Sequence, residues 1–313
     1  MMGRFTVTPL PSGRAAVTRI TIATGSTLEP GHYPTAPERR RAAHFEWASR
    51  IGDDALVDVQ ASYESFLRER HRPALARRTV DSVAAFFVPH VRSGDRLVDL
   101  GCGPGSVTVG FGAAVGPDGM VVGVDLDPGP APLSLVRADI HQLPFPNGSV
   151  DAIFVCAVLQ HLAEPLVALV EARRIARPGA VIGVADADWG SALVAPADPW
   201  LERGQAIRTA LRAGTSPFVG RELRGLLHAA GFVDVHVTAR GTGGGGPGCL
   251  GEAEFQASFF DARPVIDLVR ERALATPQDM TTIATAWRRW GRDPAATLAR
   301  HWFEAIARAP AAD

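Results

Sequence analysis

The chain has no lysine: all 32 of its basic residues are arginine, a bias that we attribute to a GC-rich coding genome. Its three cysteines, Cys102, Cys156 and Cys249, form no C-x-x-C pair, so neither a disulfide framework nor a zinc site is indicated. Such sparse cysteine use is typical of the reducing cytoplasm, where we expect this protein. No apolar run reaches the roughly 18 residues of a membrane span, so no membrane partner is expected.

An excess of charge is also lacking, because the net charge of the chain is −1. Nothing in this balance favours binding to nucleic acid or to a membrane surface. The chain contains no Pro-Pro dipeptide and no internal repeat. Its apolar content of 46% is sufficient to bury a sizeable core. We therefore expect a globular protein, and a homodimer is one open oligomeric state.

A glycine-rich segment is the most informative feature that the chain does have. Residues Asp99 to Gly105 read DLGCGPG, between a strand-like run and a helix-like run that starts at Ser106. Such a loop lets backbone N–H groups approach a ligand, because a Cβ at the glycines would block the approach. The third glycine stands one position too early for the G-x-G-x-x-G dinucleotide fingerprint, which argues against a nicotinamide dehydrogenase.

Carboxylates end the next two strand-like runs. Asp125 lies twenty positions after Gly105, about where a Rossmann-like fold hydrogen-bonds a ribose diol. Asp139 ends the run that begins at Leu133. Alone, each aspartate is equally well a strand cap or a turn former. Because open α/β sheets bind cofactors at the carboxyl ends of their strands, the ordered set favours a cofactor site.

The order of these motifs resembles that of class I S-adenosylmethionine-dependent methyltransferases, specifically the UbiE-like bacterial small-molecule type, over residues 91–237. DLGCGPG resembles motif I, and residues 143–151, LPFPNGSVD, resemble the family's LPFPDGSFD. Residues 158–162, VLQHL, resemble VLHHL with Gln160 in place of the first histidine. The resemblance implies methyl transfer to oxygen, nitrogen or carbon of a small molecule, in the manner of secondary metabolism, with S-adenosylhomocysteine as product.

The resemblance also implies which residues bind the cofactor. Asp99 is expected to contact its methionine part and Asp139 the adenine amino group, while Ile140 covers the ring. The full set of implied cofactor-binding residues is Asp99, Gly101, Cys102, Gly103, Gly105, Asp125, Leu126, Asp139, Ile140, Cys156 and Gln160.

Candidates for the acceptor side follow the fourth and fifth strands. The sulfonium methyl is already activated, so the protein must mainly orient the acceptor and exclude water, and needs a base only when the acceptor loses a proton. His161 is the candidate base, and Asp186 and Asp188 are candidates to orient the acceptor. Further candidates to line the substrate are Tyr63, His71 and Trp189. Packing roles for the aromatic residues stay open, and no metal is expected, because D-x-D at 186–188 has no further ligands nearby in sequence.

One departure from the family pattern concerns the chain between Asp125 and Asp139. The connection from Leu126 to Pro132 holds three prolines in seven residues, which excludes a helix there. We expect an extended crossover and a more open adenine side. This departure is the one support for an alternative function, a cofactor-binding protein whose methyltransferase activity is lost or repurposed.

The predicted fold is α/β: a Rossmann-like, doubly wound, mostly parallel sheet that lacks the helix between its second and third core strands, with helical additions at both ends. The predicted regions are a flexible tail at 1–41, a helical lid at 42–92, the cofactor-binding core at 93–240 and a helical segment at 241–313. Within the last region, we expect Gly243–Gly246 to be a mobile loop. We also expect a final helix from Pro294 that carries Leu298, Trp302 and Ile306.

Methylation of nucleic acid or of protein is a competing function. DNA amino-methyltransferases of similar fold carry an N/D-P-P-Y/F segment after the fourth strand. Here that place holds Cys156-Ala157-Val158-Leu159, and the near-neutral charge also disfavours a phosphate backbone as partner.

Overall fold

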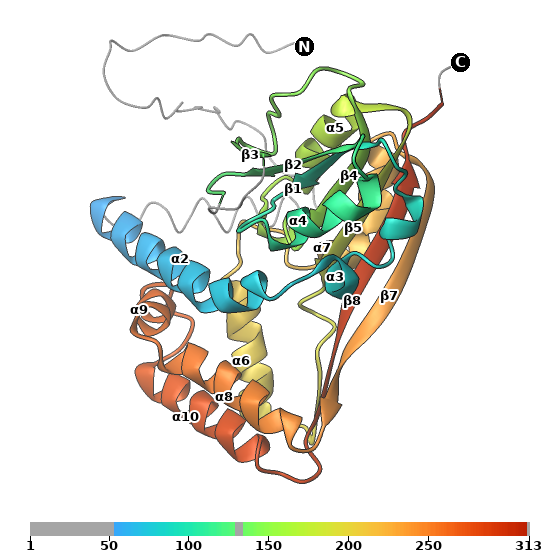
Figure 1. Cartoon of the computed structure of the whole chain (residues 1–313). Coiled ribbons are helices and arrows are strands. Elements are labelled where there is room, and N and C mark those ends of the chain that lie inside the picture. The colour runs from blue at the N-terminus through green and yellow to red at the C-terminus, as the bar shows by residue number, and fades with distance from the viewer. Residues whose placement is uncertain (1–52, 129–133, 312–313) are drawn as a thin grey trace, which may run out of the picture. The chain divides into compact units, whose positions relative to one another are not determined.

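The middle of the chain alternates strand and helix, and this alternation builds one large sheet with helices on both faces (Figure 1). The computed structural model describes residues 53–128 and 134–311. Its strands are β1 (Arg96–Leu100), β2 (Met120–Asp125), β3 (Ser134–Arg137), β4 (Val150–Cys156), β5 (Ala176–Ala187), β6 (Leu193–Ala195), β7 (Val233–Gly245) and β8 (Thr297–Arg308). Its helices are α2 (Asp53–Ala76), α3 (Val80–Val83), α4 (Ser106–Val115), α5 (Pro165–Ile175), α6 (Pro199–Ala210), α7 (Val219–Ala229), α8 (Gly248–Asp261), α9 (Arg263–Glu271) and α10 (Pro277–Trp290), with 3₁₀ turns η1 (Val88–His90) and η2 (Leu159–His161).

The strand order confirms the Rossmann-like, mostly parallel sheet. It runs β3-β2-β1-β4-β5-β8-β6, and β7 also pairs with β8. Strands β1 to β5 are parallel, whereas β8 is antiparallel to β5, β6 and β7. The order reverses between β1 and β4, and the carboxyl ends of the strands at such a switch point are where open α/β sheets bind ligands. The glycines of the segment, residues 101–105, follow β1 directly at this point.

Alternate residues of the strands face two different cores, as the period of two in a strand requires. On one face, Phe154 of β4 packs against Phe111 of α4 and Phe87, with ring centroids 5.1 and 5.3 Å away. On the other face, α5 and α7 cover residues such as Val98 and Ile153. Helices on both faces therefore hold the carboxyl edge of the sheet in place.

A third core lies among α2, α6, α8, α9 and α10, which we call the helical lobe. Figure 1 shows α6, α8 and α10 side by side. The predicted start of α10 is confirmed, because Thr276 and Asp279 form a reciprocal capping box. Trp287 of α10 is 2% exposed and packs edge-on against Trp290. The predicted helix in the region before the core is confirmed in α2.

The expected final helix from Pro294 is wrong, because residues 297–308 form strand β8. The spacing of Leu298, Trp302 and Ile306 fits a helix, but Ala305 and Ala307 are also fully buried and follow a period of two. Strand β8 pairs with β5 over seven residue pairs, from Val181↔Arg308 to Ala187↔Trp302. This non-local pairing overrides the local pattern, so the predicted helical segment at 241–313 ends in a strand of the main sheet.

The expectation that Gly243–Gly246 form a loop is also wrong, because Gly243 to Gly245 belong to β7 and pair with β8. A Cβ on Gly243 would stand 2.0 Å from the Leu298 carbonyl oxygen, and its φ is +145°. Glycine is needed here because the two backbones approach each other too closely for a side chain.

The connection between β2 and β3 is short, since residues 126–133 join two parallel strands that pair directly. Residues 126–128 are not helical. The predicted extended crossover falls largely on residues 129–133, outside the described residues, as do the predicted tail at 1–41 and the first part of the predicted lid. Within the described ranges, no helix combines the length and apolar character needed to cross a membrane.

The helical lobe predicts a large difference between two tryptophans. Trp287→Ala is expected to lower the free energy of unfolding by about 3–5 kcal/mol, because it empties a fully packed site. Trp200 of α6 is 37% exposed, so Trp200→Ala is expected to change that free energy by less than about 1 kcal/mol. Urea unfolding followed by circular dichroism measures both, and equal losses would contradict this assignment of the core.

Candidate functional site

The glycine-rich loop adopts a conformation that only glycines accommodate readily. Gly101, Gly103 and Gly105 have φ values of +75°, +52° and +78°. A Cβ on Gly101 would lie 2.1 Å from a methyl of Val158, whereas a Cβ on Gly103 would meet nothing within 4 Å. The loop thus packs closely on the chain after β4 and leaves open space at Gly103.

The first turn of α4 adds N–H donors beside this space. Gly105 is the N-cap residue of the helix, and no side chain caps it. Helix N-termini carry partial positive charge and unpaired N–H groups, which suit a carboxylate. The cradle therefore fits the amino-acid part of S-adenosylmethionine.

Asp125 ties this loop to the end of β2. Its Oδ2 accepts a hydrogen bond from the N–H of Gly103 at 2.9 Å, and its Oδ1 accepts one from the N–H of Asp127 at 2.9 Å. A carboxylate offers about four lone-pair sites, so two remain for other donors. Asp125 is half-buried and so can also reach a ribose diol.

Asp99, by contrast, is enclosed at the end of β1, with an exposed fraction of 3%. The Thr108 hydroxyl donates to its Oδ2 at 2.6 Å. Burial raises the pKa of the Asp99 carboxyl to about 7, and the charge of Asp125 adds to this effect. A neighbouring ammonium group would favour the ionised form, so Asp99 suits a cationic ligand group.

The adenine side, at the ends of β2 and β3, is open. Leu126 is 66% exposed, and the Asp139 side chain is 55% exposed. The Asp139 Oδ1 accepts the backbone N–H of His141 at 2.9 Å and lies 2.7 Å from its Nδ1. These bonds lower the pKa of Asp139. Ile140 packs partly against the main core, so one apolar wall stands beside this carboxylate.

The two predicted thiols are inert at neutral pH. Burial raises the pKa of both Cys102 and Cys156 to about 12. Since the thiolate is the nucleophile, neither residue is suited to covalent catalysis. Cys102 packs under the loop close to Gly123, and Cys156 ends β4 beneath the site.

Gln160 joins the ends of β4 and β5. Its backbone N–H donates to Oδ2 of Asp186 at 3.2 Å, and its side-chain Oε1 accepts from the Trp189 Nε1 at 2.6 Å. Asp186 is fully buried, and burial raises its pKa to about 7. Asp186 thus fixes the loop after β4, and Gln160 fixes the indole of Trp189.

The predicted acceptor contacts of Asp186 and Asp188 gain no support from these positions. Asp186 has no exposed surface, and its oxygens bond the N–H groups of Gln160 and Ala187. Asp188 forms a two-pronged ion pair with Arg221, and its Oδ1 also accepts the N–H of Gly190 at 2.8 Å. Arg221 stands 33 positions later in the chain, so this pairing could not be seen in the sequence.

Two buried arginines that sequence reasoning missed cover Trp189 from the helical lobe. The Arg212 Cζ lies 3.5 Å from a ring centroid of Trp189, and that of Arg208 lies 5.1 Å away. Arg208 lies in the last turn of α6, and Arg212 stands four positions later, in the turn that follows the helix. That spacing was a readable signal, but it did not reveal their burial.

The remaining predicted residues lie near these arginines. Tyr63 is 3% exposed, while His71 is half-buried against Phe255. The pKa of His71 is lowered to about 4 by burial and by Arg208, Arg70 and Arg212.

His161 belongs to the same neighbourhood. Its side chain is exposed on one side. Desolvation by the surrounding protein is the largest cause that lowers its pKa to about 4, and the charges of Arg212 and Arg78 lower it further. His161 is therefore neutral at physiological pH and can accept a proton, although weakly. The structure brings Tyr63, His71, His161 and Trp189 to one place.

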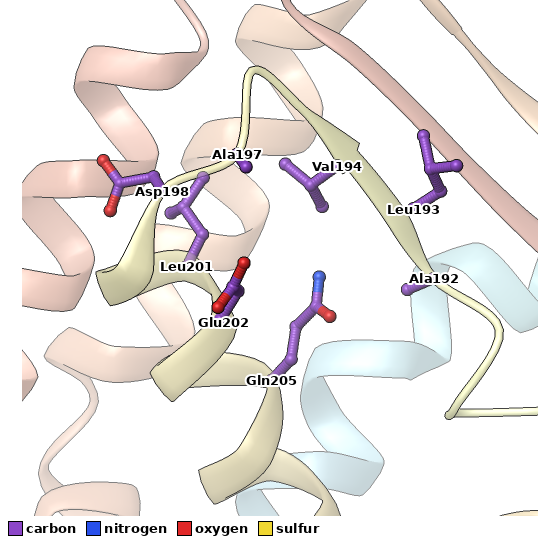
Figure 2. Close-up of a pocket in the computed structure, with 8 residues that line it drawn as sticks. All are labelled: Ala192, Leu193, Val194, Ala197, Asp198, Leu201, Glu202 and Gln205. Atoms are coloured by element: carbon purple, nitrogen blue, oxygen red, sulfur yellow. The ribbon is translucent and has the colours of Figure 1, made fainter.

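Two surface pockets are lined by residues other than the predicted site residues. One, of about 240 Å³, lies between β6 and α6 and is lined by residues such as Leu193, Leu201 and Gln205 (Figure 2). The other, of about 370 Å³, borders the glycines of β7. Neither contains a predicted site residue. Within 53–128 and 134–311, no three His, Cys, Asp or Glu residues form a group that could hold a metal ion.

Comparison with known proteins gives concordant matches. The sequence model of a family described as "Methyltransferase domain" matches residues 98–184. An uncharacterised methyltransferase of Schizosaccharomyces pombe is 34% identical over 200 residues, which cover 56% of this chain and 69% of that protein. A demethylmenaquinone methyltransferase of Symbiobacterium thermophilum is 27% identical over 168 residues, or 49% of this chain and 62% of that protein. Among solved structures, a putative methyltransferase from Bacillus halodurans has a TM-score of 0.46 at 15% identity, covering 70% of this chain and 94% of that one.

The buried carboxylates predict a particular pH dependence of stability. Asp99 and Asp186 have pKa values raised from 3.8 to about 7 in the folded protein. The folded state thus binds more protons than the unfolded state between these values. The free energy of unfolding is expected to fall as pH rises towards about 7.

Asp99→Asn removes one of the two carboxyls with a raised pKa. The Thr108 hydroxyl can still donate to the new amide or accept from it, so the hydrogen bond at this position is kept. The variant is expected to make the decline between about pH 4 and pH 8 about half as steep. Urea unfolding without cofactor measures the slope, and Asp118→Asn, an exposed aspartate in a turn, is the control. An unchanged slope in Asp99→Asn would show that Asp99 is ionised throughout.

Proposed function

The chain belongs to the S-adenosylmethionine-dependent methyltransferase family, and on that premise we propose that it methylates a small molecule held between the carboxyl edge of the sheet and the helical lobe. The observation that carries this proposal is the hydrogen bond from the Gly103 N–H to Asp125, at 2.9 Å. It joins the glycine-rich loop to the carboxylate that suits a ribose, at the switch point of the sheet.

The hydrogen-bonding groups along the carboxyl edge of the sheet match the parts of the cofactor in order. The uncapped first turn of α4 suits its carboxylate, and the enclosed Asp99 suits its ammonium group. Asp125 retains acceptor capacity for the ribose, and Asp139 with Ile140 suits adenine. Leu126 lies on this open side, where little protein covers the base. We assign cofactor binding to these residues, with Cys102, Cys156 and Gln160 supporting the floor of the site.

When bound, the cofactor supplies an activated methyl group on a sulfonium. The residues of the chain then need to hold the acceptor in line and exclude water. Trp189 provides a flat apolar wall whose orientation Gln160 fixes. Tyr63 and His71 come from α2 and lie near the lobe arginines. They are suited to line the acceptor.

His161 is the group best placed to take a proton when the acceptor must lose one. It is neutral above a pH of about 4, because burial lowers its pKa to about that value, so it can serve as a weak base. Asp186 and Asp188 act as positioning residues in this scheme: the first holds the loop that carries His161, and the second holds the chain beside Trp189.

We also infer the setting from composition and family. A chain with few cysteines, near-zero net charge and UbiE-like relatives is suited to bacterial small-molecule metabolism in the cytoplasm. The same balance of charge disfavours nucleic acid as the substrate. The atom that receives the methyl group follows from the acceptor and not from the fold.

Calorimetric titration with S-adenosylhomocysteine tests the proposed cofactor site. The wild-type chain is expected to bind it, and Asp125→Ala is expected to weaken binding about 10- to 100-fold, because charge-assisted hydrogen bonds are lost. Asp127→Ala is the matched control. Its side chain is 78% exposed and pairs with Arg137, while its backbone N–H still donates to Asp125.

Binding that is equally strong in both variants would contradict the role of Asp125. No binding to the wild type at millimolar ligand would contradict the proposed function. Tight binding without methyl transfer to any of a broad panel of small molecules would favour the repurposed alternative.

A further inference from the structure

Arg208 and Arg212 carry charge into the protein interior without a carboxylate to offset it. They are 7% and 8% exposed. Among the described residues, neither forms an ion pair, whereas thirteen other pairs do occur. The nearest acidic residue in their network, Glu252, reaches Arg208 only through Gln256 and is itself paired with Arg300. Charges are almost never fully buried unless they are paired.

The protein satisfies only part of the hydrogen-bonding capacity of these two side chains. Arg208 donates from Nη1 to the Gln256 Oε1, and Arg212 donates from Nη1 to the Arg208 carbonyl at 3.2 Å. Each guanidinium has five N–H donors. Some buried side-chain atoms of the described residues have no hydrogen-bond partner and no exposed area, but the nitrogens of Arg208 and Arg212 are not among them. Both arginines keep a small exposed area, so neither is sealed from the surface of the protein.

Tyr63 supplies a second, independent sign of a ligand. Its side chain is 97% buried, since its exposed fraction is 3%, yet its hydroxyl has no hydrogen-bond partner within the described residues. The hydroxyl lies close enough to Arg212 and Arg208 for their charges to act on it. A buried hydroxyl without a partner is costly, and a bound acceptor group would remove this cost.

The surroundings combine these donors with aromatic faces. Arg212 lies against Trp189, and the Arg208 Cζ lies 4.7 Å from the ring centroid of Phe259. Because Gln160 bonds Trp189, this cluster is connected to the chain after β4, next to the cofactor site. Phe259 is 1% exposed and belongs to the core of the lobe, so Trp189, which is half-buried, is the ring of this cluster that a ligand could touch.

Local structural roles account for only part of this arrangement. Arg208 in the last turn of α6 and Arg212 just after it lie where the helix dipole favours cations, and both make cation–π contacts. Against these gains stand the cost of desolvating two charges and the repulsion between the two arginines. Burial and this repulsion lower the pKa of Arg208 to about 9. A structural role alone would be served at least as well by apolar residues.

We infer that Arg208, Arg212 and the Tyr63 hydroxyl bind an acidic group, a carboxylate or a phosphate, of a methyl acceptor whose apolar body packs on Trp189. This inference rests on the proposed function, because it assigns the acidic group to the acceptor of that reaction. It narrows the acceptor to anionic small molecules with a flat or unsaturated part. The planar fork of arginine suits both oxyanions.

Titration of the full chain with benzoate, phenyl phosphate and the neutral benzamide, each with and without S-adenosylhomocysteine, tests the inference. At least one anion is expected to bind about tenfold or more tightly than benzamide, because charge-assisted hydrogen bonds distinguish them. The stronger of the two anions identifies the oxyanion. Arg212→Gln is expected to weaken that anion about tenfold or more, with S-adenosylhomocysteine affinity unchanged.

Two further variants keep the test decisive. Arg203→Gln, at an exposed position of α6, is the matched control and is expected to leave anion affinity unchanged. Tyr63→Phe removes only the unpartnered hydroxyl, so it is expected to weaken anion binding without lowering the melting temperature. It remains informative if an arginine variant fails to fold.

Three outcomes would overturn the inference: equal binding of benzamide and both anions, full anion affinity in Arg212→Gln and Tyr63→Phe, or no binding of any probe at millimolar concentration. Loss of S-adenosylhomocysteine affinity in Arg212→Gln would overturn it too, because the arginines would then hold the cofactor. Failure of the wild type to bind S-adenosylhomocysteine, with anion binding intact, would instead contradict the proposed function.

Discussion

Carboxylates at the carboxyl ends of the parallel strands are satisfied by backbone N–H groups of the neighbouring loops, and the site depends on this constraint. Asp125 at the end of β2 accepts from Gly103 in the loop after β1, and Asp186 of β5 accepts from Gln160 in the loop after β4. Because a buried acceptor without a donor is costly, each carboxylate fixes the loop beside it. The proposed cofactor cradle and the proposed wall of the acceptor site are therefore positioned by bonds between strand ends and the neighbouring loops.

The helical lobe contacts the chain that follows β4 and β5 at the edge of the sheet. Gln160, which follows β4, hydrogen-bonds the indole of Trp189, and Trp189 in turn stacks on Arg212 from the turn after α6. In the proposed reaction, the sheet holds the methyl donor and the lobe holds the acceptor. Positioning then supplies much of the rate, and the neutral His161 needs to act only for acceptors that lose a proton.

The sequence was most informative where function requires short-range patterns. The glycine spacing of residues 99–105, the order of Asp125 and Asp139, and the capped start of α10 were all readable locally, and they led to the correct fold and family. Strand β8 was missed, because its pairing with β5 joins residues more than 100 positions apart. The pairing of Asp188 with Arg221 and the burial of Arg208 depend likewise on tertiary contacts, which no local pattern encodes.

A crystal structure of the chain with S-adenosylhomocysteine tests the central claim most directly. We predict that the ribose hydroxyls bond Asp125, that the amino-acid part lies over Gly103 at the start of α4, and that the sulfur faces the space beside Trp189 and Arg212. A ligand bound away from the glycine-rich loop, or a sulfur directed away from Trp189, would contradict the account.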